Sequence, residues 1–243
     1  MKRSCILMPI EGEISISQVA DQSPYKTARI AGFLYFVFIL TSIIADLFGQ
    51  FVIADASTTV NNIIAHESLF RIGFVIYLFS YVFFLLAAWA LYVLLKPVNK
   101  NIALLFLLLH LAGFAMMYAS TLTLFTALML LSGADYLQVF QPDQLQAQAM
   151  LFINLFKNGA TIAQIPYGIW LFPLGYLVFK SGSLPKILGI LLMVDCFGLL
   201  TYVLQRVLLP GYDIISYPFL MISFIAEISL SLWLLIKGVK DQK

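Results

Sequence analysis

The sequence of 243 residues is 62% hydrophobic and only 11% charged, with a mean hydropathy of +0.96. Soluble domains carry about 25% charged residues, and a water-soluble core cannot absorb such an apolar excess. Composition therefore excludes an ordinary soluble domain and indicates an integral membrane protein. The formal net charge is only +2, so nothing suggests a nucleic-acid partner.

The first 27 residues are interpreted as a cytoplasmic tail. Their apolar stretch 6–8 is stopped by Pro9 and followed by acidic residues. It is therefore too short to be the core of a signal peptide, which needs roughly 7–15 apolar residues. The expected organisation is an N-terminal tail over 1–27, a transmembrane domain over 28–238 and a C-terminal tail over 239–243.

Six stretches are long enough to cross a bilayer, which takes about 20 apolar residues in a helix. Each is bounded by charge, proline or glycine. The sequence thus predicts an all-α, polytopic membrane protein with six transmembrane helices. Pro166 and Pro173 are expected to kink the fourth. Trp89, Trp170 and Trp233 are expected to form an interfacial belt. The six stretches are 29–53, 70–95, 101–132, 159–179, 186–209 and 214–236.

The lysines and arginines predict how the chain is oriented. With the N-terminus inside, eleven of the fourteen face the cytoplasm, and only Arg71, Lys157 and Arg206 lie outside. The opposite orientation reverses this ratio. The positive-inside rule therefore predicts that both termini are cytoplasmic. The expected location is the inner (plasma) membrane, which the chain crosses several times.

Two connections on the predicted outer side are long and amphipathic. Residues 55–69 place Val60, Ile63 and Ile64 on one helical face, and residues 142–157 begin with a proline that favours a helix start. Both are expected to form short helices at the outer interface. For the second segment an alternative stays open, namely that it extends the fourth transmembrane helix outward.

Three ionisable residues are predicted at one depth near the middle of the bilayer. Counted at about 1.5 Å per residue, His110, Asp195 and Glu227 each lie about 13 Å from the cytoplasmic ends of their helices. Such residues are costly in lipid and need a partner or a purpose. They either form one functional cluster that holds a cation, relays protons or anchors a polar head group, or they are hydrogen-bonding contacts between helices.

A second group of polar residues is predicted near the outer ends of the helices. The opposite charges and matched heights of Asp46 and Arg206 favour an ion pair. The alternative is a set of solvated interfacial charges with extended side chains. Asn154, Asn158 and Gln164 are candidates for neutral polar lining of the same region.

Four segments, 28–35, 69–73, 94–100 and 175–189, together resemble a bacterial membrane family, domain of unknown function 4386. The resemblance covers about residues 28–238. It implies a six-helix prokaryotic membrane protein and no established activity. It also implies that relatives often carry an arginine where His110 stands here. A mechanism centred on His110 would therefore depart from the family pattern.

Three classes of function follow. The best guess is either a binding or transport-like bundle for a small molecule or lipid, since midplane polar groups and broken helices mark such sites, or a membrane scaffold without a ligand. The alternative is an intramembrane metal-assisted hydrolase using His110, Asp195 and Glu227. No established metalloprotease or serine-hydrolase motif is present. A non-enzyme is favoured, with no metal or cofactor, and with the bilayer as partner. The oligomeric state stays open.

Overall fold

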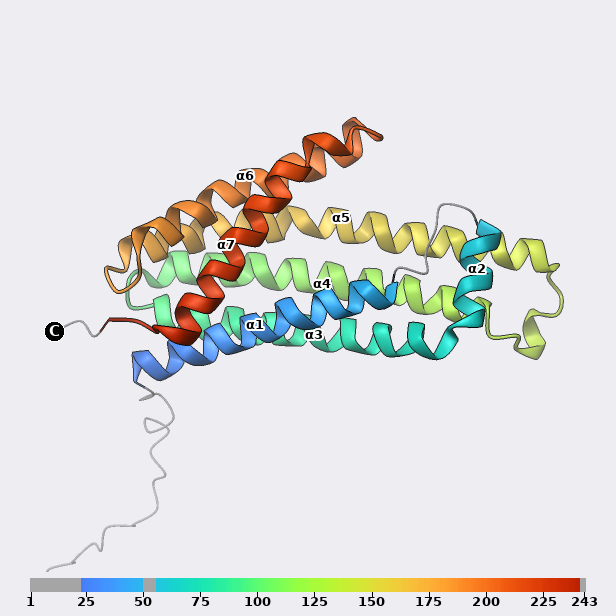
Figure 1. Ribbon diagram of the computed structural model, residues 1–243, viewed down its shortest axis with the longest axis horizontal. Coiled ribbons are helices and arrows are strands. Elements are labelled where there is room, and N and C mark those ends of the chain that lie inside the picture. The colour runs from blue at the N-terminus through green and yellow to red at the C-terminus, as the bar shows by residue number, and fades with distance from the viewer. Residues whose placement is uncertain (1–22, 50–55, 241–243) are drawn as a thin grey trace, which may run out of the picture.

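The computed structural model describes residues 23–49 and 56–240, and over these ranges the chain is helical with short connections (Figure 1). Six of the helices are long and apolar enough to cross a membrane, so the predicted all-α polytopic fold is confirmed. The α-helices are α1 (Pro24–Gly49), α2 (Ala56–Ala65), α3 (Glu67–Leu95), α4 (Lys100–Leu130), α5 (Pro142–Lys180), α6 (Lys186–Leu208) and α7 (Tyr217–Ile236). Two short 3-10 helices, η2 (Asp135–Leu137) and η3 (Asp213–Ile215), lie in the connections.

Most helix boundaries follow the local signals in the sequence. Asn99 caps α4, because its side-chain oxygen accepts the backbone N–H groups of Asn101 and Ile102, both at 3.1 Å. Helix α1 begins at Pro24, inside the predicted tail, and residues 1–22 of that tail lie outside the described ranges. The same holds for 50–53 of the first predicted stretch and for 241–243 of the C-terminal tail.

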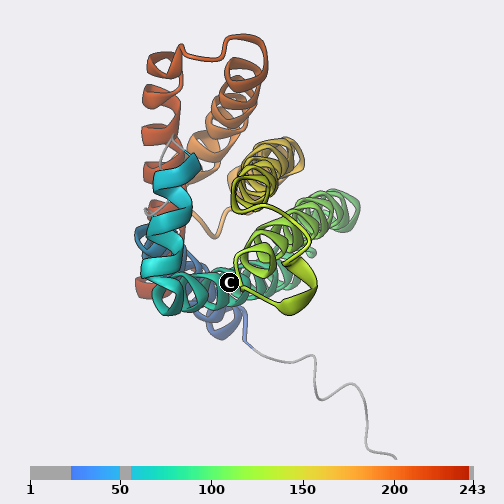
Figure 2. The ribbon, with the colours of Figure 1, turned by 90° about the vertical axis from the view of Figure 1, so that its right-hand side faces the viewer.

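The two amphipathic segments fold differently. The first forms α2, a separate helix that lies across one end of the bundle (Figures 1 and 2). The second is the N-terminal part of α5, a single helix of 39 residues that continues through Pro166 and Pro173. Its start is fixed by Pro142 and a capping box between Gln141 and Gln144. The open alternative is therefore the observed one, because nothing between 142 and 159 breaks the helix.

Helices α1, α3, α4 and α5 run side by side along the bundle, whereas the α6–α7 hairpin diverges from them (Figure 1). The described parts of both chain ends lie at one end of the bundle, which we call the terminal end, and α2 lies at the other, the α2 end. Helix α7 packs on α1 and α6. The hairpin and the rest of the bundle thus meet at the terminal end and separate toward the α2 end.

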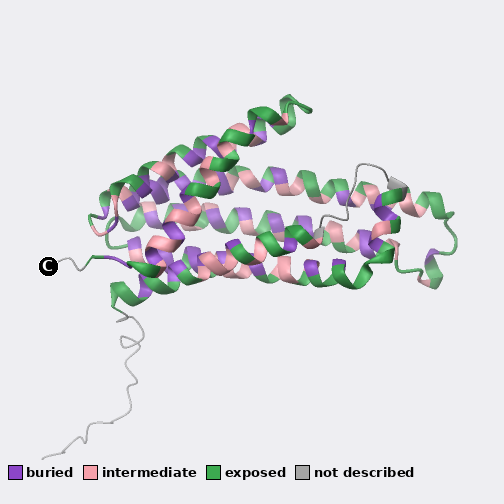
Figure 3. Ribbon diagram, viewed as in Figure 1, coloured by how far each residue is buried: buried purple, intermediate pink, exposed green. Residues whose placement is uncertain are grey.

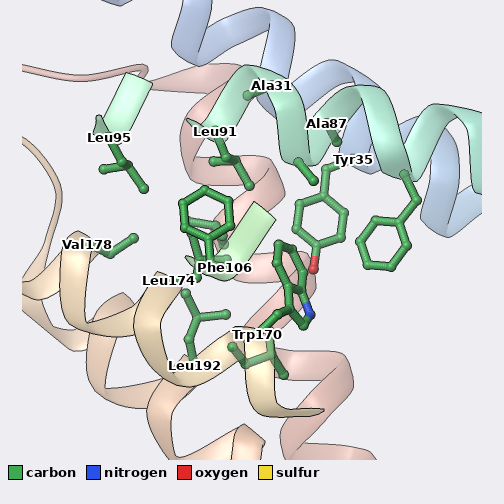
Figure 4. Close-up of a cluster of buried hydrophobic side chains, with 14 of the residues drawn as sticks. Ala31, Tyr35, Ala87, Leu91, Leu95, Phe106, Trp170, Leu174, Val178 and Leu192 are labelled. Carbon is green, nitrogen blue, oxygen red and sulfur yellow. The ribbon is translucent and has the colours of Figure 1, made fainter. Parts of the chain in front are cut away.

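The largest core lies in the terminal half, where buried residues concentrate (Figure 3). Its most deeply buried large side chains include Trp170, Tyr35 and Phe106, each at most 1% exposed (Figure 4). Trp170 is therefore a core residue, and its prediction as part of an interfacial belt is wrong. Trp89, in contrast, is 55% exposed, as expected for a side chain that faces lipid.

Helices α5 and α6 approach closely where two glycines face each other. A Cβ atom added to Gly175 would lie 2.6 Å from the carbonyl oxygen of Gly189, and one added to Gly189 would lie 2.5 Å from that of Gly175. Small residues permit such backbone approach, which strengthens helix packing in a bilayer. This contact joins the hairpin to the bundle at the terminal end.

Candidate functional site

A cavity of about 360 Å³ lies between the diverging hairpin and the rest of the bundle. It is bordered by five of the transmembrane helices, α1, α3, α4, α5 and α6. Its walls combine aromatic and apolar side chains with hydroxyl, amide and charged groups. The lining residues are Ser42, Asp46, Tyr77, Tyr81, Met117, Phe156, Lys157, Ala160, Thr161, Gln164, Tyr202 and Arg206.

Charged groups reach this cavity from three helices. Asp46 comes from α1, Lys157 from α5 and Arg206 from α6. Arg206 forms an ion pair with Asp213 at 3.2 Å. Within the described ranges, neither Asp46 nor Lys157 has an ion-pair partner. The cavity wall therefore contains one acidic and one basic residue, both exposed, that form no ion pair within the described ranges.

The predicted pair of Asp46 with Arg206 is not formed, although both residues line the same cavity. The reason lies in the fold. Asp213 follows α6 after a short connection and can reach back to Arg206, while Asp46 lies on α1, from which the hairpin diverges. Height along the helices therefore did not identify the partner of Arg206, which is Asp213.

Two tyrosine hydroxyls on α3 form part of the cavity wall. Tyr77 and Tyr81 are four residues apart, so they lie on the same face of the helix, and their hydroxyl oxygens are 3.3 Å apart. Tyr77 donates to the sulfur of Met117 at 3.4 Å, so Tyr81 is left to donate to Tyr77. In the sequence, only their spacing of four residues distinguishes these two tyrosines from the other aromatic residues.

His110 is fully buried among aromatic rings. Its ring centroid lies 4.3 Å from that of Phe84, 4.5 Å from that of Trp170 and 5.2 Å from that of Tyr167. Neither ring nitrogen has a hydrogen-bond partner. Within the described structure, His110 therefore makes no hydrogen bond to Asp195 or Glu227, because aromatic side chains surround the imidazole.

Asp195 and Glu227 lie on α6 and α7, which pack against each other. Asp195 is fully buried and accepts a hydrogen bond from the hydroxyl of Ser223 on α7. Glu227 lies one turn further along α7 and interacts electrostatically with Asp195. The hydroxyl of Tyr35, on α1, is buried close to Glu227 but makes no hydrogen bond of normal length. The predicted cluster thus consists of two carboxyl groups without the histidine.

These positions do not form a metal site. Among the residues that the structure describes, no three His, Cys, Asp or Glu side chains are grouped so as to hold a metal ion. A metal-assisted hydrolase needs His110 as a ligand beside the carboxylates, and His110 lies in its own aromatic environment. The hydrolase hypothesis is therefore not favoured.

Comparison with known proteins places the chain in a family. The model of the family described as domain of unknown function 4386 matches residues 30–238. An uncharacterized protein of the archaeon Archaeoglobus fulgidus is 34% identical over 153 residues, which cover 63% of this chain and 75% of that protein. No solved structure matches the chain significantly. The family model extends from α1 to the end of α7, so the chain belongs to the domain of unknown function 4386 family.

Proposed function

We propose that this protein binds, and by extension transports, a small amphiphilic molecule in the cavity between the α6–α7 hairpin and the rest of the bundle. The observation that supports this function is the charge of the cavity wall. Asp46 and Lys157 line it without an ion-pair partner among the described residues. Charged groups within transmembrane helices are costly unless they pair or serve a site.

The lining also suggests the chemistry of the ligand. The cavity of about 360 Å³ falls in the range of small-molecule pockets, which are about 300–1,000 Å³ and mostly apolar with a few polar groups. Lys157 and Arg206 favour an anionic group on the ligand, and Asp46 favours a cationic or donor group. Phe156 and the tyrosines offer an apolar surface between them. A zwitterionic or anionic amphiphile fits this arrangement.

The experiment uses the full chain, purified from the plasma membrane where we expect it and placed in lipid nanodiscs. Native mass spectrometry identifies molecules that copurify, and a thermal-unfolding screen tests zwitterionic and anionic amphiphiles. The variant Ala160→Trp fills the cavity, because Ala160 is part of its wall. The control Ala119→Trp places the same side chain on an exposed face of α4.

We expect at least one compound to stabilise the wild type and the Ala119→Trp control, and to have no effect on Ala160→Trp. Lys157→Gln should weaken the same compound by about tenfold, the loss expected for one charged hydrogen bond of about 1.4 kcal/mol. If every stabilising compound acts equally on Ala160→Trp, the cavity is not the binding site. If none stabilises the wild type, the scaffold interpretation is preferred.

A further inference from the structure

Asp195 and Glu227 lie outside the cavity lining, and buried polar atoms beside them lack hydrogen-bond partners. Both residues belong to transmembrane helices, α6 and α7. Asp195 is completely inaccessible to solvent, and one of its two carboxyl oxygens, Oδ2, has no hydrogen-bond partner. The buried Tyr35 hydroxyl, which lies close to Glu227, also lacks one. A carboxyl oxygen of Asp195 and the Tyr35 hydroxyl thus lack hydrogen-bond partners on either side of the half-buried Glu227.

The groups that face this pair carry no compensating positive charge. Ser223 contacts Asp195 from α7, Cys196 lies beside it on α6, and Tyr35 and Tyr81 face Glu227 from α1 and α3. Within the described ranges, no Lys, Arg or His forms an ion pair with either carboxylate. Two interacting carboxylates cannot both be ionised in such surroundings without a bound cation.

We propose that Asp195 and Glu227 form a proton-binding site in which the two carboxyl groups share one proton. One carboxyl group then donates a hydrogen bond to the other, ionised, one, and this fills the unpartnered capacity of the pair. Transfer of the proton forms an O–H bond on one residue as the O–H bond on the other breaks. The site joins α6 to α7 near the middle of the bilayer. The contact between these two helices, which form the hairpin beside the cavity, then depends on the bound proton.

Tyr81 provides the route by which this proton exchanges with water. It lines the cavity together with Tyr77, to whose hydroxyl it is hydrogen-bonded at 3.3 Å. It also interacts electrostatically with both Asp46 in the cavity and Glu227. A hydroxyl group can accept one proton and release another. We therefore route the exchange of this proton from the cavity through the Tyr81 hydroxyl to the carboxyl pair.

Infrared spectroscopy tests the site directly, since a protonated carboxyl group has a C=O stretching band that a carboxylate lacks. In nanodiscs at neutral pH, in potassium buffer, the wild type should show this band. Asp195→Asn and Glu227→Gln should each shift it, and the double variant should lose it. Glu67→Gln and Asp46→Asn are controls that should retain it. Circular dichroism and gel filtration verify that each variant is folded.

A wild-type spectrum without the band, or a band that survives in the folded double variant, would overturn the proposal. So would a band that disappears when sodium replaces potassium, because the pair would then hold a metal cation. This readout needs no ligand, so failure of the proposed function leaves it unaffected. For the route, Tyr81→Phe should slow deuterium exchange of the band, while the cavity variant Tyr202→Phe should not. Equal exchange rates in both variants would exclude Tyr81.

Discussion

The terminal half and the α2-end half of the molecule differ in how they are packed. In the terminal half, aromatic side chains and closely approaching glycines leave large residues such as Trp170 and Phe106 completely buried. Toward the α2 end the hairpin diverges and borders a cavity lined by charged and hydroxyl groups, while a smaller core, with Val60, Phe70 and Ile153, packs α2 onto the bundle. The closely packed terminal half therefore joins the hairpin to the bundle, while the α2-end half contains the polar residues of the cavity.

The largest difference is expected for the orientation of the two halves in the membrane, because a cysteine on one side is either labelled by an impermeant reagent or not labelled at all. In a background without Cys5 and Cys196, a single cysteine at Asp143 should react with an impermeant thiol reagent in intact cells. One at Ser183 should react only after the membrane is opened. These results are expected because the positive-inside rule places the α2 end outside. Labelling of Ser183 from outside would reverse the assignment.

Trp170→Ala should cause the largest loss of stability. Trp170 is 1% exposed and packs against His110, Phe84 and Phe106. Truncation of such a side chain leaves a cavity and typically costs about 3–5 kcal/mol. Phe156→Ala, in the wall of the existing cavity, should cost clearly less. Chemical unfolding of the purified protein measures both, and equal losses would mean that the two halves are packed alike.

Gly189→Val should destabilise the protein by about 1–3 kcal/mol, the usual cost of overpacking. The added side chain would collide with the backbone of α5 at Gly175. Ala112→Val, on an exposed part of α4, is the matched control and should have little effect. Thermal unfolding in nanodiscs distinguishes them. A Gly189→Val protein as stable as the control would show that α5 and α6 are free to separate at the terminal end.

His110→Phe should leave stability unchanged or raise it by about 1 kcal/mol. The two imidazole nitrogens are buried without partners, and an unsatisfied polar group costs about 1–3 kcal/mol. Phenylalanine has a similar shape and suits the surrounding rings. Unfolding curves for the variant and the wild type give the comparison. A large loss of stability, or loss of ligand binding, would restore His110 as a functional residue.

The smallest effect on the free energy of unfolding is expected for the ion pair between Arg206 and Asp213, beside the cavity. Arg206 and Asp213 are both about half exposed, and pairs of this kind contribute at most about 1 kcal/mol. A double-mutant cycle with Arg206→Gln and Asp213→Asn should show a small favourable coupling energy. A cycle with Asp46→Asn should show none. Coupling between Arg206 and Asp46 that exceeds the Asp213 value would contradict the observed pairing.

The number and approximate positions of the transmembrane helices could be predicted from the amino-acid sequence. Bilayer thickness and helical rise fix the length of a membrane-crossing segment, so six apolar stretches predicted six helices. Most boundaries lie close to those observed, but the fourth helix begins at Pro142, well before the predicted start at 159. Local signals such as Asn99 and Pro142 located where individual helices begin. These features depend on residues that are neighbours in the chain, which is why they could be predicted.

The tertiary structure alone decided which residues meet. Counting residues gives the depth of a side chain in the bilayer but not the rotation of its helix or the identity of the neighbouring helix. His110, Asp195 and Glu227 shared a predicted depth, yet α5 and α3 surround the histidine with Trp170 and Phe84, while α6 and α7 bring the two carboxyl groups together. The divergence of one hairpin likewise gave Arg206 a partner and opened the cavity, because packing between distant segments sets both.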